Sequence, residues 1–392
     1  MSNEQNSTTP PTTSTPASGD VIMSSSTEDT PETKFTKLKT LFTKYLKEHT
    51  VYETIPENMK ILVFNSELTI KDSIEAMIKE DIYCGLLWDT SQSKYVGLFT
   101  IRDVLSLIKL AYTHCLSYIS KHGVSNLSSL SEEIFKIGVP QESNDDKMEV
   151  DDESSKTNFD SLIKNFSQFF KIFDSVTISQ YITTFKEKNK KLVSLSLDGN
   201  LQECIKLIRE NKIHRIVVED LKSSTITGFI TYEAIFEFFI ENYYSEMTEF
   251  NIDLSNINII SKNIITLDKK ETIFKCMDTF YSKKISLIPI IDKENGNDVF
   301  GYFYLKDIIY FFSNGEKFSF NDTIESFLLD LYEDVDNERP LGKDRIVQIE
   351  ENENLKNVFE QMSICPERKL IVKSKDDIGV ITLSNIFTTL VD

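Results

Sequence analysis

One short segment occurs four times in this chain of 392 residues, and it restricts the possible folds more than any other feature. Gly97–Asp103 reads GLFTIRD, at the junction between a predicted strand and a predicted helix. Related segments begin at Gly228 (GFITYEA), Gly301 (GYFYLKD) and Gly379 (GVITLSN). The first and third end in a carboxylate, the second in Ala234 and the fourth in Asn385. A chain that repeats one small unit must bury apolar surface between its copies.

The residues around each segment predict the same order of elements, β-α-β-β-α. In the first copy these elements are Ile61–Phe64, Ile70–Glu80, Gly85–Asp89, Tyr95–Thr100 and Ile101–Tyr112. The strands are rich in β-branched and aromatic residues, and the helices carry an apolar stripe. The fold class is therefore α/β, and we expect copy 1 to pair with copy 2 and copy 3 with copy 4.

Tandem β-α-β-β-α units that end in such a Gly-to-Asp segment resemble CBS domains. Four of them in one chain resemble the gamma regulatory subunits of the AMP-activated (Snf1-type) protein kinase. The resemblance is most specific in the leading stretch, which contains HTVYETIPENMKILVFNSELTIKDSIEAM and LLWDTSQSKYVGLFTIRD. The resemblance covers residues 40–392 and implies a non-catalytic subunit with two paired CBS (Bateman) modules. It also implies binding of AMP, ADP or ATP, and assembly with a kinase alpha subunit and a beta subunit into a heterotrimer in the cytoplasm or nucleus.

The domain boundaries follow from the repeat and from changes in composition. We expect a disordered Ser/Thr/Pro-rich tail, a leading helix, four CBS units and an acidic disordered insertion. The ranges are 1–34 for the tail, 35–60 for the leading segment, 61–119 for CBS 1, 120–165 for the insertion, 166–245 for CBS 2, 257–315 for CBS 3 and 338–392 for CBS 4. The apolar run at 162–173 is predicted to re-enter the fold as a helix.

The carboxylates at the end of the repeated segment are the candidate ribose ligands. An ionised acid accepts strong hydrogen bonds from both ribose hydroxyls. By the resemblance, Asp103 and Asp307 match the ribose-binding acids of the family. The alternative is that each Asp only caps the helix that it begins. Ala234 has lost this function, and Asn385 lacks the charge, so we expect a weakened fourth site.

Cations and hydroxyl groups near the same segments are the candidate phosphate ligands. His214-Arg215 match the family's His-Arg phosphate contact, and Arg368-Lys369 fall at the corresponding place in copy 4. The alternative is an exposed, solvated pair on a strand. The resemblance further assigns hydroxyl donors and one more basic contact. These residues are Thr100, Ser286, Thr382, Ser384 and Arg339. The segment of copy 1 is the best preserved, but copy 3, around Asp307, is the expected working nucleotide site.

Two positions depart from the family pattern in ways that weaken binding. Tyr83 and Glu233 stand where the family has Arg and Lys, and Glu233 repels a polyphosphate. In copy 3, Lys283-Lys284 stand where the family has a His-Arg pair, and we expect them to compensate for the lost cations; the alternative is that each lysine is an exposed, solvated charge.

Charge and motif content exclude several other functions. A formal net charge of −19 disfavours a nucleic-acid or anionic-lipid partner. No apolar run is long enough to span a membrane, and the five scattered cysteines are expected to be buried thiols. The sequence contains no P-loop, GxGxxG motif, metal cluster or Ser/His/Asp arrangement. We therefore expect no enzyme and no catalytic cofactor, and the remaining alternative is a kinase scaffold that has lost most nucleotide sensing.

Overall fold

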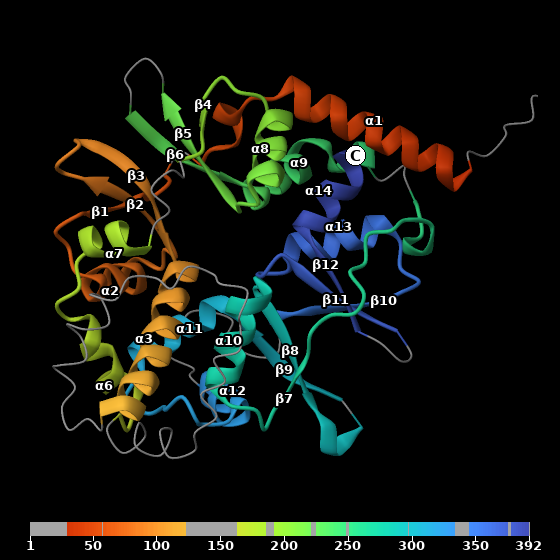
Figure 1. Ribbon diagram of the computed structural model, residues 1–392. Helices are drawn as coiled ribbons and strands as arrows, with labels where there is room; N and C mark the ends of the chain where they lie inside the picture. The colour runs from red at the N-terminus through yellow and green to blue at the C-terminus, as the bar shows by residue number, and fades with distance from the viewer. Residues whose placement is uncertain are drawn as a thin grey trace, which may run out of the picture.

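The computed structural model describes residues 30–56, 58–122, 163–185, 192–220, 225–247, 251–296, 298–333, 345–374 and 378–391. Within these ranges it contains four three-stranded sheets, one in each copy of the repeat (Figure 1). The expected tail up to residue 29 and most of the expected insertion lie outside the described residues.

The four copies contain corresponding elements in the predicted order. Copy 1 has β1 (Leu62–Asn65), α2 (Ile70–Glu80), β2 (Cys84–Asp89), β3 (Lys94–Thr100) and α3 (Ile101–His122). Copy 2 has β4 (Ser194–Ser196), α8 (Leu201–Asn211), β5 (Arg215–Asp220), β6 (Thr225–Thr231) and α9 (Tyr232–Met247). Copy 3 has β7 (Leu267–Asp268), α10 (Ile273–Lys283), β8 (Leu287–Asp292), β9 (Asp298–Tyr304), a 3-10 turn (Leu305–Asp307) and α11 (Ile308–Ser313). Copy 4 has β10 (Val347–Glu350), α13 (Leu355–Ile364), β11 (Lys369–Lys373), β12 (Ile378–Thr382) and α14 (Leu383–Val391).

Each sheet follows the same rule of strand pairing. The first strand pairs parallel to the second, and the second pairs antiparallel to the third, as in β1-β2-β3. The parallel pair is joined through a helix, as parallel strands require. That helix begins at a Thr or Asn whose side chain accepts a hydrogen bond from the backbone three residues later. The capping residues are Thr69, Asn200, Thr272 and Asn354.

The segments that precede the copies are exchanged within each pair. Thr50, which follows α1 (Pro31–Glu48), forms a β-bridge with Asn200 of copy 2, and Thr177, before α7 (Ile178–Phe185), forms one with Thr69 of copy 1. The same exchange joins Asp253 to Asn354 and Thr323, before α12 (Ile324–Glu333), to Thr272. The expected pairing of copy 1 with 2 and of copy 3 with 4 therefore has a backbone basis.

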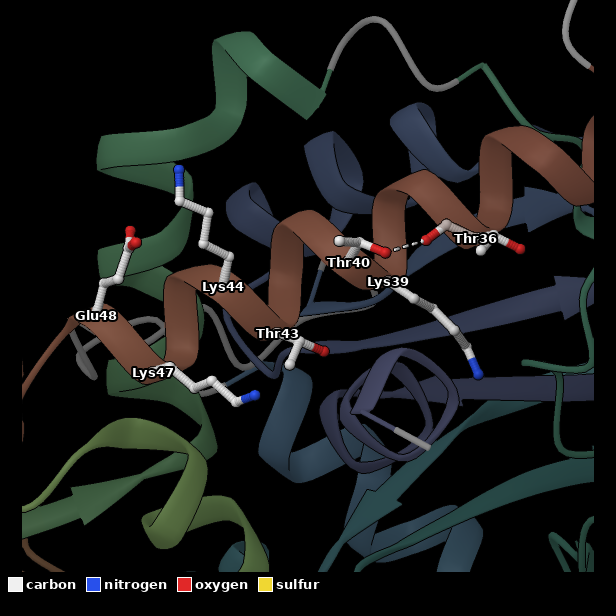
Figure 2. Close-up of a pocket in the computed structure, with 7 residues that line it drawn as sticks. All are labelled: Thr36, Lys39, Thr40, Thr43, Lys44, Lys47 and Glu48. Atoms are coloured by element: carbon white, nitrogen blue, oxygen red, sulfur yellow. Dashed lines mark hydrogen bonds between the residues drawn. The ribbon is translucent and has the colours of Figure 1, made fainter.

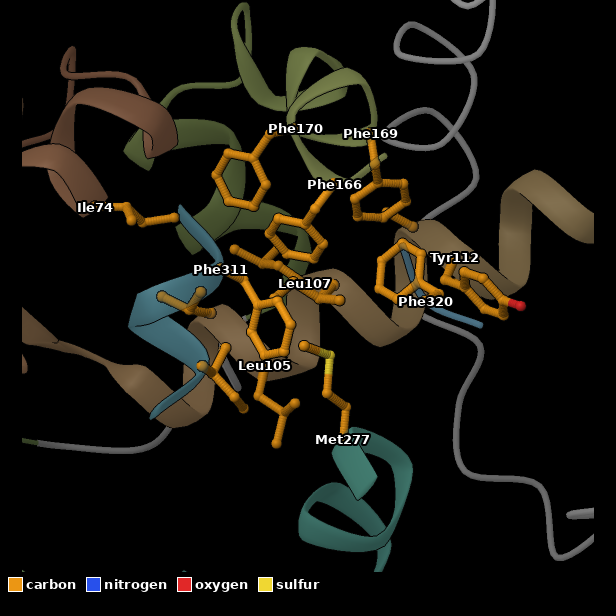
Figure 3. Packing of buried hydrophobic residues seen from close by; sticks show 14 of the residues in the cluster. Ile74, Leu105, Leu107, Tyr112, Phe166, Phe169, Phe170, Met277, Phe311 and Phe320 are labelled. Carbon is orange, nitrogen blue, oxygen red and sulfur yellow. The ribbon is translucent and has the colours of Figure 1, made fainter. Parts of the chain in front are cut away.

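Two large apolar cores join the two pairs to each other. One core combines copies 1 and 3 with α6 (Phe166–Phe170), the turn Lys171–Phe173 and α7. Figure 3 shows Phe166 of α6 and Phe311 of α11 in this core together with Phe320, which lies in the segment before Ile324. The other combines copies 2 and 4 with α1, where Phe42 lies against Phe239 and Phe387. Smaller clusters lie between the sheets of copies 1 and 2 and of copies 3 and 4.

Three expected boundaries need correction. The leading helix begins at Pro31 rather than 35, because Thr30 caps it and Pro31 fits its first turn. Helix α3 reaches His122, beyond the expected end at Tyr112, because Cys115 and Leu116 continue its buried stripe.

The third correction concerns the start of CBS 2. The segment containing α6 and α7, expected to begin copy 2 at residue 166, packs in the core of copies 1 and 3. Only part of the apolar run at 162–173 is α-helical, since a 3-10 turn takes over at Lys171.

Candidate functional site

The repeated segment of copy 1 places Asp103 in the first turn of α3, directly after strand β3. The Thr100 N–H and hydroxyl both donate to Asp103 Oδ2, over 2.7 and 2.6 Å. The Tyr181 hydroxyl of α7 donates to the other oxygen, Oδ1. Burial and the Asp103 charge raise the pKa of Tyr181 well above its usual value, so this phenol stays a donor. Asp103 is only half-buried, and one neutral hydroxyl holds the oxygen that faces away from its own turn.

Copy 4 repeats this geometry with an amide. The Thr382 N–H and hydroxyl donate to Asn385 Oδ1 over 2.9 and 2.7 Å, and Asn385 Nδ2 donates to the Ser261 hydroxyl over 3.0 Å. In copy 2 the Ala234 N–H donates to the Thr231 hydroxyl over 3.3 Å, and no side chain completes the turn. The turn therefore forms with Asp, Asn or Ala, and the acid is not required for the fold of a copy.

Copy 3 differs, because its acid lies in a buried ion cluster. Asp307 Oδ2 accepts from the Tyr304 N–H over 2.8 Å, and Oδ1 accepts from Arg345 Nη2 over 2.8 Å. Arg345 also donates to Glu367 Oε1, from Nη2 over 3.0 Å and from Nε over 3.3 Å. The side chains of Asp307, Arg345 and Glu367 are 2%, 3% and 6% exposed. Sequence reasoning gave no role to Arg345 or Glu367.

Further cations surround this cluster. Lys306 Nζ lies 2.5 Å from Glu367 Oε1, and Arg345 Cζ and Lys369 Nζ lie 4.4 and 5.2 Å from the centre of the Tyr304 ring. Burial raises the pKa of Asp307, and Arg345 opposes that rise. Burial would also raise the pKa of Glu367, but Lys306 and Arg345 outweigh it and hold that pKa low. Among the described residues, Tyr304 Oη and Arg345 Nη1 are buried without a hydrogen-bond partner.

A second group of cations comes from copies 1, 2 and 4. His214 lies close enough to Arg102, Arg215 and Lys369 for their charges to act on it. Burial and these three cations together lower its pKa to about 4, although His214 as a whole residue is exposed to solvent. Arg102 donates to the Lys284 carbonyl over 3.2 Å. We call Arg102, Arg215 and Lys369, together with the imidazole of His214, the cation group; at neutral pH the imidazole itself is uncharged.

Acidic residues only partly balance the cation group. Burial lowers the pKa of Lys369, while Glu367 and Glu233 oppose that shift. Within the described part of the chain, no salt bridge joins Arg102, His214 or Arg215 to a carboxylate. Such cations, partly withdrawn from water, favour an anion among them. Arg102 was missed in the sequence, and its place next to Asp103 gave no signal, because consecutive residues of a helix point in different directions.

Other predicted ligands lie elsewhere. Arg368 donates to the Met362 carbonyl at the end of α13 over 2.9 Å and to Glu237 over 2.8 Å, so its guanidinium is engaged in structure. The Tyr83 hydroxyl donates to Asp81 over 2.5 Å. Ser384 is exposed and Ser286 half-buried. Arg339 lies outside the described residues, so the basic contact expected there stays a prediction.

Two surface hollows do not coincide with these groups. One, of about 450 Å³, follows the outer face of α1 and is lined by Thr36, Lys39, Thr40, Thr43, Lys44, Lys47 and Glu48 (Figure 2). Thr36 and Thr40 donate to carbonyls of their own helix over 2.9 Å each, so few polar groups converge there. The other, of about 210 Å³, lies between α2, α6 and α11. Neither contains a predicted nucleotide ligand.

The described residues contain no group of three or more His, Cys, Asp or Glu arranged to hold a metal ion. Over the same ranges, every helix is too short or too polar to span a bilayer.

Comparisons with known proteins agree with this architecture. The CBS domain family model matches residues 186–241 and 255–314. The gamma subunit of the 5'-AMP-activated protein kinase of Dictyostelium discoideum is 23% identical over 269 residues, which cover 67% of this chain and 37% of that protein. The human gamma-3 subunit is 18% identical over 357 residues, covering 90% of this chain and 60% of the human protein.

A solved structure shows the same fold. The crystal structure of a Methanocaldococcus jannaschii protein, proposed as an archaeal homologue of the gamma subunit, has a TM-score of 0.55 at 13% identity. The match covers 87% of this chain and 99% of the archaeal one. The chain thus contains tandem CBS domains, matched at residues 186–241 and 255–314. Among proteins with such domains, its resemblance to the gamma subunits of AMP-activated protein kinase is confirmed.

Proposed function

We propose that this chain is a non-catalytic regulatory subunit of an AMP-activated (Snf1-type) protein kinase, and that it binds an adenine nucleotide between its CBS domains. The kinase alpha and beta subunits are the proposed partners, in the cytoplasm or nucleus. The similarity to gamma subunits supports the partner class. AMP, ADP and ATP are the proposed regulatory ligands, and the site geometry supports an anion with a ribose attached.

The observation that carries the ligand proposal is the cation group. Arg102, His214 and Lys369 come from three different copies, and the charges of Arg102 and Lys369 act on His214. Glu367, Glu233 and Asp307 act on Lys369, whereas over the described residues no salt bridge joins Arg102 or His214 to a carboxylate. A phosphate dianion at the cation group would form charge-assisted hydrogen bonds with the guanidinium and ammonium groups. Asp103 lies one residue from Arg102 in the same helical turn. A nucleotide whose phosphate meets the cation group therefore has an acid for its ribose nearby.

Titration of the full chain with AMP and with adenosine tests the ligand proposal. Adenosine keeps the base and ribose but lacks the phosphate. We expect AMP to bind at least about tenfold more tightly, since one charge-assisted contact contributes about 1.5–3 kcal/mol. Equal affinities for the two compounds would show that the cation group does not contact the ligand. Binding of neither compound would refute nucleotide binding.

A second candidate is a scaffold that joins the kinase subunits without sensing nucleotide. The observation in its favour is the unequal state of the four acids, since Ala234 and Asn385 lack the charge and Asp307 is buried in an ion cluster. Co-purification with alpha and beta subunits, followed by a kinase assay with and without AMP, separates the two candidates. A complex that forms but ignores AMP supports the scaffold.

A further inference from the structure

The two acids retained by the repeat have opposite surroundings. Asp103 is half-buried, and a neutral hydroxyl from Tyr181 holds its Oδ1. Asp307 is buried, and the charged guanidinium of Arg345 holds its Oδ1 over 2.8 Å. The two positions are equivalent in the repeat, so the difference arises from what the rest of the chain places beside them.

Arg345 is fixed in this position from several sides. It precedes strand β10, so copy 4 supplies it to the acid of copy 3. Glu367, also from copy 4, accepts from Arg345 Nη2 over 3.0 Å and from Nε over 3.3 Å. The aromatic ring of Tyr304 lies 4.4 Å from Arg345 Cζ. The guanidinium is therefore clamped between two carboxylates and over an aromatic ring.

We propose that Arg345 is a built-in plug that takes the place of a ligand at Asp307, so that copy 3 offers no acid to a nucleotide. This inference rests on the proposed function, because it decides which retained acid can serve the ligand. Asp307 positions Arg345 and joins copy 3 to copy 4. Asp103 alone keeps the ribose role that the resemblance assigns to both acids.

A ribose hydroxyl would compete with Arg345 for Asp307, and the existing contacts favour Arg345. Both carboxylate oxygens are already used, Oδ2 by the Tyr304 N–H and Oδ1 by Arg345. Each oxygen could accept one more bond, but the Asp307 side chain is only 2% exposed, so a neutral ribose hydroxyl could reach it only by displacing the ion-paired guanidinium. Displacement would leave the guanidinium with fewer partners away from water, which is strongly unfavourable. Copy 1 imposes no such barrier, because the Tyr181 hydroxyl is neutral.

A pair of identical substitutions tests the proposal by AMP titration of the full chain. Asp307→Asn is expected to change AMP affinity by less than twofold while lowering the melting temperature. Asp103→Asn is expected to weaken AMP binding at least tenfold. A tenfold or larger loss of AMP affinity in Asp307→Asn, or the loss of a bound equivalent, would overturn the proposal.

Removal of the plug gives the complementary test. In Arg345→Met/Glu367→Gln, the arginine and its second acid are both neutralised, so Glu367 leaves no unpaired charge and the Asp307 carboxylate is left without its ion pair and free to accept from a ligand. We expect the double variant to bind one more AMP than wild type, and addition of Asp307→Asn to abolish the gain. A folded double variant without the gain would contradict the plug, and if this variant does not fold, the Asp307→Asn result decides. Failure of wild type to bind AMP at all would count against the proposed function and leaves the gain in the double variant measurable.

Discussion

Asp103→Asn separates a ligand-binding acid from a helix cap. Asp103 accepts two bonds from Thr100, over 2.7 and 2.6 Å, and one from Tyr181. Asn385 in copy 4 accepts the same two bonds from Thr382, over 2.9 and 2.7 Å. The chain itself therefore shows that an amide supports this turn. We expect Asp103→Asn to fold and to lose at most about 1 kcal/mol of stability, the value of a cap.

Nucleotide binding should respond much more strongly than stability. Replacing the carboxylate by an amide removes the charge from the bonds that ribose hydroxyls donate. Hydrogen bonds to charged groups contribute about 1.5–3 kcal/mol, which corresponds to a loss of about 10- to 150-fold in AMP affinity. Isothermal titration of AMP measures the affinity, and urea unfolding of the same samples measures the stability.

The control for this experiment is Asp278→Asn. Asp278 forms a partly exposed salt bridge with Lys109 over 2.7 Å, outside the candidate site, and its loss should leave AMP affinity unchanged. An unchanged AMP affinity in Asp103→Asn would show that Asp103 is only a cap. Equal losses in Asp103→Asn and Asp278→Asn would point to a general effect of charge.

Of three further predictions, one concerns the core and two concern His214 of the cation group. Phe42→Ala removes a 1%-exposed ring whose centre lies 4.7 Å from that of Phe239 and 5.6 Å from that of Phe387. Urea unfolding should show that the free energy of unfolding falls by about 3–5 kcal/mol. A decrease below about 1 kcal/mol would contradict the packing of α1 in this core. His214 has a pKa of about 4 in the folded chain, below the unfolded value of about 6.5. On acidification from pH 6.5 to 4 the unfolded chain therefore binds the proton first, which lowers the stability of the folded chain. This loss of stability should be smaller in His214→Gln than in wild type. A bound phosphate would raise the pKa of His214 again, so AMP binding near pH 6 should be accompanied by proton uptake. Calorimetric titration in buffers of different ionisation enthalpy measures this uptake, which should be smaller in His214→Gln than in wild type. Equal uptake in the two proteins would place the phosphate away from His214.

The sequence predicted the elements inside each copy well, for a local reason. Strand and helix signals repeat within each copy, and the helix that follows the first strand begins at a Thr or Asn cap. The expected strand Ile61–Phe64 is β1 at Leu62–Asn65, and the expected helix Ile70–Glu80 is α2 with the same bounds. Periodicity and capping depend only on neighbouring residues, so one sequence is enough to find them.

The arrangement between copies was harder to predict. The exchange of leading segments depends on backbone bonds between distant residues, such as the Val51 N–H to the Gly199 carbonyl over 2.8 Å. Nothing local in residues 166–185 indicates that they pack with copies 1 and 3. Composition and spacing therefore assigned α6 and α7 to copy 2.

Arg345 shows why the candidate site was only partly predictable. The acids Asp103 and Asp307 were visible in the repeated segment, and His214-Arg215 were visible at the start of a strand. Arg345 stands 38 positions from Asp307, and no spacing rule connects an arginine before one strand to an acid in another copy. Sequence reasoning therefore favoured copy 3 as the best site, whereas the geometry favours copy 1.

The number of AMP molecules bound per chain tests the central claim most directly. The cation group and Asp103 define one working site, while Ala234, Asn385 and the plugged Asp307 weaken the other positions. Equilibrium dialysis of the purified full chain against labelled AMP should give one tightly bound equivalent. No bound AMP would contradict the nucleotide-binding role, and two tight equivalents that Asp307→Asn reduces to one would show that the acid of copy 3 is open to ligand.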